Sequence, residues 1–118
     1  MTDLIASLGA GKGTWTQVNA VLSSNPWSNV FVVSNSFGAE NFKPSKKVEF
    51  VVVDDLAPIP QLVLDISAKL RGRVKGNEVA VNFASGSGNL HMALLSALLK
   101  LGLGIRLMSF ENGTLAEI

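Results

Sequence analysis

One pattern in this sequence limits the folds that it can adopt, a passage from an apolar run, through a glycine turn, into a helix. It occurs first as "LIASLGAGKGTW" at residues 4–15 and again as "VNFASGSGNLHMALLSALLKLG" at residues 81–102. Such a passage is typical of a buried strand followed by a tight turn and a covering helix. "KVEFVVVDD" at residues 47–55 adds the near-continuous β-branched run of a strand covered on both faces. The sequence therefore predicts an α/β protein.

The order of the expected elements defines the fold class more closely. Pro58 and Pro60 are tolerated in the first turn of a helix, and the Asn-Gly pair at residues 112–113 is a strong hairpin signal. We expect strands at residues 3–8, 29–35, 47–55, 78–84, 104–110 and 114–118, helices at residues 14–23 and 88–101 and from Pro58 to Leu70, and a loop at residues 35–47. This order predicts a Rossmann-like three-layer sandwich with a mostly parallel six-stranded sheet and an antiparallel C-terminal hairpin.

Composition places the chain among single-domain globular proteins, and its net charge restricts the kinds of ligand that we expect. With 118 residues, 47% of them hydrophobic, we expect one domain over residues 1–118. The formal charge is only +1, so a long nucleic acid is not an expected partner and any anionic ligand must be bound locally. The basic residues Lys69, Arg71, Arg73 and Lys75 are interpreted as a solvated helix end, the alternative being a nucleic-acid patch.

Several classes of site and location are disfavoured by what the sequence lacks. There is no cysteine, which excludes disulfides, thiolate metal sites and a cysteine nucleophile. A signal peptide is not expected, because residues 1–11 lack a basic start and a long apolar stretch. A membrane span is not expected either, because His91, Lys100 and Arg106 interrupt the apolar residues 90–107. A cytoplasmic protein without cofactor or metal is the resulting expectation.

The glycine turns are the candidate binding surface. Ligands of open α/β sheets collect at the C-terminal ends of the parallel strands, and a helix that begins there offers free N–H donors to an anion. Tight turns without a ligand are the alternative interpretation. We predict that three turns contribute ligand-binding residues: Gly9, Gly11, Lys12, Gly13 and Thr14 after the first strand, Ser34, Asn35 and Ser36 after the second, and Ser85, Gly86, Ser87, Gly88 and Asn89 after the fourth.

The first of these turns departs from a P-loop. A complete G-x-x-x-x-G-K-[ST] motif would need glycine at position 6 and serine or threonine at position 13, where the chain has Ala6 and Gly13. A nucleoside-monophosphate kinase would also need clamping arginines, and the chain has only Arg71, Arg73 and Arg106. An NTPase or a kinase is therefore disfavoured.

The two passages together resemble the CRISPR-associated Rossmann fold (CARF) domain, which senses cyclic oligoadenylates. "SLGAGKGTWTQVNAVL" is similar to the opening strand, Leu-Gly turn and helix of that family, and "VNFASGSGNLHMALLSALLKLG" is similar to its fourth strand, Gly/Ser/Thr turn and Ala/Leu-rich helix. The resemblance spans the chain and implies an antiviral homodimer that binds a cyclic oligoadenylate as a sensor or as a metal-independent ring nuclease.

The chain departs from the family pattern at two points. Many members carry Gly-Gly-Thr-Lys where this chain has residues 86–89, so Lys12 would have to supply the positive charge. Members usually carry an effector domain after the sensor, so three alternatives remain: action alone, a separate effector protein, or a longer chain of which these residues are one domain. The alternative function is a Rossmann-like module that binds a mononucleotide or another protein without catalysis.

The last long helix is a candidate dimer surface. From Leu90 to Leu101 it is apolar nearly all round, with His91, Ser96 and Lys100 as its polar members. Full burial in the core is one interpretation, and an isologous contact with a second copy is the other.

A catalytic role is open on the sequence alone. There is one histidine and no nucleophile-elbow motif, and Asp55 is interpreted as a helix cap. If an RNA ring is cleaved, positioning and charge stabilisation would carry the reaction. The candidate catalytic residues are then Lys12, Ser87 and His91, although His91 is also interpreted as structural.

Overall fold

The computed structural model describes residues 2–118 and contains one six-stranded sheet. The strands are β1 (Asp3–Ser7), β2 (Val30–Ser34), β3 (Glu49–Val52), β4 (Glu78–Asn82), β5 (Gly104–Glu111) and β6 (Thr114–Glu117). Their order in the sheet is β3-β2-β1-β4-β5-β6, with β1 to β5 parallel and β6 antiparallel to β5. The predicted Rossmann-like sandwich is confirmed.

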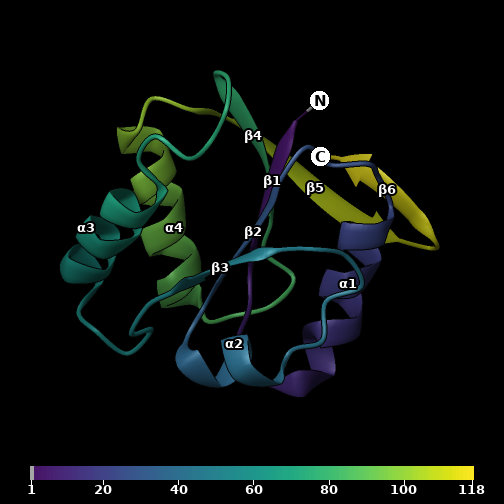
Figure 1. The fold of residues 1–118 in the computed structure, drawn as a ribbon, viewed down its shortest axis with the longest axis horizontal. Coiled ribbons are helices and arrows are strands. Elements are labelled where there is room, and N and C mark those ends of the chain that lie inside the picture. Colours follow the sequence, from purple (N-terminus) through teal and green to yellow (C-terminus); the bar gives the residue numbers. More distant parts are fainter. Residues whose placement is uncertain (1) are drawn as a thin grey trace.

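Helices cover both faces of this sheet (Figure 1). On one face lie α3 (Ile59–Leu70) and α4 (Gly88–Lys100), and on the other lies α1 (Trp15–Ser23), which follows a short 3-10 helix η1 (Lys12–Thr14). The six-residue helix α2 (Ser36–Asn41) follows β2 at the C-terminal edge of the parallel strands.

Alternating strand side chains divide the core into two layers. In β1, Leu4 and Ala6 pack toward α1, whereas Ile5 packs toward α3 and α4. All three side chains have no exposed area. A strand buried on both faces explains why its sequence is continuously apolar instead of alternating. The apolar residues that recur at helical spacing along α1 and α3 face the core. Ile59 is partly buried, and the others are buried: Val18, Val21, Leu22, Leu62, Val63, Ile66 and Leu70.

The C-terminal hairpin forms as its turn sequence predicts. Asn112 and Gly113 have φ values of 53° and 76°, and Glu111 pairs with Thr114 across the turn. Positive φ at both central residues is the requirement of a type I′ turn, which asparagine and glycine meet at low cost.

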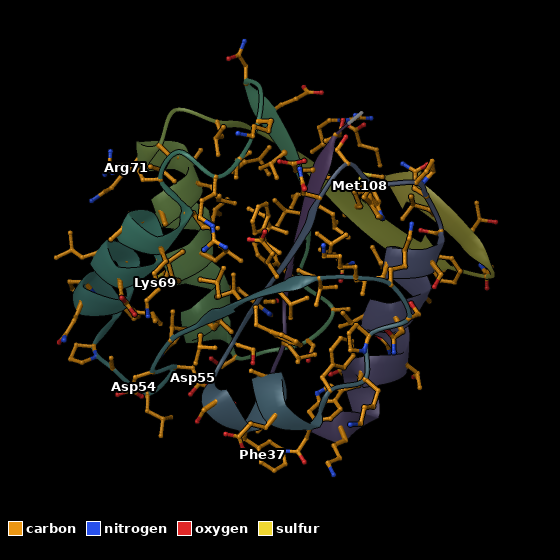
Figure 2. The ribbon with its side chains drawn as sticks, viewed as in Figure 1. Phe37, Asp54, Asp55, Lys69, Arg71 and Met108 are labelled. Atoms are coloured by element: carbon orange, nitrogen blue, oxygen red, sulfur yellow. The ribbon has the colours of Figure 1, made fainter. Side chains whose placement is uncertain are left out.

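Two local expectations are wrong. The segment expected as a loop at residues 35–47 contains α2, because the Asn35 side chain accepts a hydrogen bond from the Gly38 amide and caps that helix. Asp55 does not cap α3, because Pro58 occupies the N-cap position and Asp55 instead accepts from the Asn35 side chain. The short loop between β3 and α3 carries both Asp54 and Asp55 to the C-terminal edge of the sheet (Figure 2).

Candidate functional site: the joined turns of β1 and β4

The strand order reverses between β1 and β4, and the turns that follow these two strands contact each other. The Thr14 hydroxyl donates a hydrogen bond to Ser85 Oγ (2.6 Å), and the Gly9 amide donates to the same oxygen (2.9 Å). Ser7 Oγ donates to the Ser85 carbonyl oxygen. The buried Ser85 therefore links both turns, and we call residues 9–14 and 85–89 the joined turns.

Glycine is required where the joined turns meet. A Cβ atom on Gly9 would lie 2.9 Å from both Cα and N of Gly86, closer than real Cβ contacts. Gly86 itself has a φ of 103°, which L side chains rarely adopt. Because the backbones touch, a ligand must lie over the surface that the two turns make together and not in a gap between them.

Two helical segments begin at this surface. Gly11 is the N-cap of η1, and both Gly11 and Gly13 are exposed with open space around them. The Ser87 side chain caps α4 by accepting from the Leu90 amide (3.1 Å), while Gly88 and Asn89 form the exposed first turn. Helix starts present amide donors and a positive dipole end, so the joined turns favour an anion.

Lys12 belongs to the first of the joined turns, and its ammonium lies over two aromatic rings. Its Nζ lies 5.8 Å from the ring centroid of Trp15 and 5.6 Å from that of Phe37 on α2. The Trp15 ring is in turn fixed by a hydrogen bond from Nε1 to the Gly9 carbonyl oxygen (2.8 Å). A cation over aromatic faces is attracted by their negative potential, so the ammonium is held beside the first turn while it stays exposed.

The predicted residues after β2 lie at the same edge, but they bond mainly within their own turn. Ser34 is buried, and its hydroxyl donates to the Asn35 carbonyl oxygen (2.6 Å). Asn35 caps α2 through Oδ1, and its Nδ2 donates to the two carboxylate oxygens of Asp55 (3.4 and 3.3 Å). Ser36 is exposed in the first position of α2. These contacts order the turn and orient Asp55.

His91 is tied to the second turn by its own side chain. Its Nε2 lies 2.8 Å from the Ser85 carbonyl oxygen, and its ring stacks on Phe83 with centroids 4.9 Å apart. A carbonyl oxygen only accepts, so Nε2 carries the proton and donates it. This bond leaves Nδ1 as the nitrogen free for other chemistry and gives His91 a role in holding the turn.

Open grooves flank the joined turns on both sides. The β2–β3 groove has a volume of about 480 Å³ and is lined by Asn35, Ser36, Phe37, Val52, Val53, Asp54, Asp55 and Lys69. Figure 2 shows Phe37, Asp54 and Asp55 at this end of the molecule. On the other side, a groove of about 330 Å³ lies at the ends of β4 and β5 and includes Asn82, Phe83, Met108 and Ser109.

Two classes of feature are missing from the described residues. Residues 2–118 contain no cluster of three or more histidine, cysteine, aspartate or glutamate side chains that could hold a metal ion. Within the same range, none of the helices has both the length and the apolar character needed to cross a bilayer.

The sequence was also compared with known proteins. It matches no protein-family model, and no curated protein matches it significantly. The arrangement at the joined turns is therefore the basis for assigning a function.

Sequence reasoning missed two residues at this edge. Phe37 lies in a segment that the sequence predicts as a loop, and the sequence predicts Asp55 as a helix cap. The signal that could have located both is Asn35, a favoured N-cap residue directly after a strand, which indicates a helix at residues 36–41.

Proposed function

We propose that this chain is a CARF-like module that binds a cyclic oligoadenylate over the joined turns of β1 and β4. The observation that carries the proposal is the Ser85 contact, in which the Thr14 hydroxyl and the Gly9 amide meet Ser85 Oγ at 2.6 and 2.9 Å. It brings two helix starts together at the point where the strand order reverses, which is where open α/β sheets bind ligands.

The chemistry of this surface suits phosphodiesters. The exposed glycines Gly11, Gly13 and Gly88 let phosphate oxygens approach the backbone, and Lys12 adds a positive charge beside them. Because the formal net charge is only +1, these local groups must supply the attraction for an anionic ligand.

A second copy of the chain completes the proposed site. Helix α4 turns one side to the core and buries five residues: Leu90, Ala93, Leu94, Ala97 and Leu98. On its other side, Met92 is 59% exposed and Leu99 is 61% exposed, with Leu95 beside them. These three side chains, with Ser96 and Lys100, line a shallow apolar hollow of about 420 Å³. The stripe begins about one turn after the joined turns, so an isologous contact along α4 would bring two joined turns near one axis.

Slow cleavage of the bound ring is a finer form of the same proposal. The ring's 2′-hydroxyl would attack the adjacent phosphorus, and the 5′-oxygen would leave with a proton, giving a linear product with a cyclic phosphate end. Lys12 and the Ser87 hydroxyl are the groups that would meet the developing charge, with His91 as the third candidate. The function implies a cytoplasmic protein that takes part in antiviral defence.

Thermal unfolding with cyclic tetra-adenylate and cyclic hexa-adenylate tests the proposal. A ligand at one hundred times its Kd stabilises the folded state by about 2.7 kcal/mol, which corresponds to a rise in Tm of about 10 °C for a chain of this length. Chromatography of the labelled ring after incubation then separates a sensor from a ring nuclease.

The alternative is a module for an ordinary mononucleotide or for another protein. Retention of ATP or AMP through purification, together with no shift from either ring, would favour the mononucleotide. A folded protein whose Tm responds to neither the rings nor the mononucleotides contradicts the nucleotide assignment altogether.

A further inference from the structure

The β2–β3 groove lies beside the joined turns and combines an exposed aromatic ring with fixed polar groups. We propose that this groove binds one ribonucleoside unit, with its base stacked on Phe37, its ribose hydroxyls at Asp55 and its phosphate directed toward Lys12. The inference rests on the proposed function, because the joined turns define where the phosphate lies.

Phe37 has the position and exposure of a stacking platform. Within residues 2–118 it is the one aromatic side chain classed as exposed, at 44%, and it lines the groove. The ring is backed by Trp15, whose centroid lies 6.2 Å away at an interplanar angle of 46°. A backed but exposed ring keeps its orientation and still offers a face to a base, as stacking platforms for nucleotides do.

Asp55 supplies hydrogen-bond acceptors at the same groove. Within the described residues, the hydrogen bonds to its carboxylate come from Asn35 Nδ2, at 3.4 and 3.3 Å. A carboxylate has about four acceptor positions, so it can also accept from a pair of ribose hydroxyls. Asn35 cannot turn away, because its Oδ1 accepts from the Gly38 amide.

Lys12 connects this groove to the joined turns. Its Nζ lies 5.6 Å from the Phe37 centroid, so one nucleotide can place its phosphate at the ammonium and its base on the ring. The ligand would thus run from the joined turns into the groove. Lys69 also lines the groove, where its ammonium donates to the Val52 carbonyl oxygen (2.6 Å) and pairs with the Asp65 carboxylate (3.2 Å).

A metal site would be the competing use of these carboxylates. Asp54 Oδ1 already accepts from the Leu56 amide (3.1 Å), and in residues 2–118 no third acidic, histidine or cysteine ligand joins the pair. The exposed ring has no role in binding a cation through oxygen ligands, whereas it has one in binding a nucleoside. The groove therefore fits a nucleoside better than a metal ion.

Fluorescence titration with AMP, 2′-deoxy-AMP and ribose 5-phosphate tests the subsite. The protein has two tryptophans, so a Trp27→Phe background leaves Trp15, beside Phe37, as the reporter. We expect AMP to quench Trp15 and to bind at least tenfold more tightly than ribose 5-phosphate. Phe37→Ala should weaken AMP binding about fivefold to a hundredfold. Glu40→Gln, an exposed change on the same helix, should leave it unaltered.

Two further measurements test the ribose contact of Asp55 and the stacking on Phe37 separately. The unaltered protein should prefer AMP to 2′-deoxy-AMP, because Asp55 accepts from the ribose hydroxyls. Asp55→Asn should reduce this preference to less than twofold. Circular dichroism checks that each variant folds, and Phe37→Leu replaces Phe37→Ala if the latter does not. Equal AMP affinity in the Phe37 variant and Glu40→Gln, or equal binding of AMP and ribose 5-phosphate, overturns the subsite.

The same variants with cyclic tetra-adenylate distinguish this inference from the proposed function. If the ring binds and Phe37→Ala does not weaken it, the subsite is wrong and the proposed function stands. If AMP binding depends on Phe37 but the ring does not bind, the subsite stands and the cyclic ligand is wrong. Absence of binding by AMP and by the ring at millimolar concentration contradicts both.

Discussion

Replacement of Gly9 by alanine tests the contact on which the site depends. The added Cβ would lie 2.9 Å from two backbone atoms of Gly86, about half an ångström inside an ordinary contact. Neither atom can rotate away, so the joined turns must separate. Overpacking of this kind costs about 1–3 kcal/mol. The free energy of unfolding should fall by that amount, which corresponds to a fall in Tm of roughly 4–12 °C.

Gly11→Ala is the matched control, and urea unfolding is the assay. Gly11 has a φ of −74° and nothing within 4 Å of its added Cβ. Its replacement should change the free energy of unfolding by less than about 1 kcal/mol, because alanine restricts the unfolded chain but is a poorer N-cap than glycine. The two variants should differ in urea midpoint with similar m-values. If they unfold at the same urea concentration, the described contact between the turns is refuted.

Three further substitutions test the site and the proposed dimer. Lys12→Ala should lower the free energy of unfolding by no more than about 1 kcal/mol, the value of an exposed cation–π contact, but should weaken the binding of cyclic tetra-adenylate at least about tenfold by calorimetry; equal affinity would exclude Lys12 from the site. Ser85→Ala leaves the Gly9 amide without its side-chain acceptor, so urea unfolding should show a loss of about 1–3 kcal/mol, and a neutral result would count against the linking role of Ser85. Leu99→Gln should convert the proposed dimer into a folded monomer in analytical ultracentrifugation, and an unchanged sedimentation coefficient would show that α4 does not form the interface.

The sheet and the long helices could be predicted because their signals are local and periodic. Leu62, Val63 and Ile66 recur at helical spacing and are buried in α3, and the pair at residues 112–113 requires positive φ values that few other residues tolerate. These signals act over a few residues, so the sequence contains them in full.

The structural features that the sequence does not predict are a short helix and contacts between residues far apart in the chain. Helix α2 has six residues, too few for a helical period to emerge, and only its Asn35 cap indicates it. The hydrogen bond from Thr14 to Ser85 joins residues 71 positions apart, and the Lys12 contact with Phe37 depends on α2. The sequence could place these residues at one edge of the sheet but not identify which side chains meet.

Amide chemical-shift mapping by NMR, with cyclic tetra-adenylate titrated into the ¹⁵N-labelled protein, tests whether the two joined turns bind one ligand. We expect the amides at residues 11–14 and at residues 86–89 to shift together along one saturating curve. Shifts confined to one of these segments, or to a different edge of the sheet, would contradict a single phosphate-binding surface built from both turns.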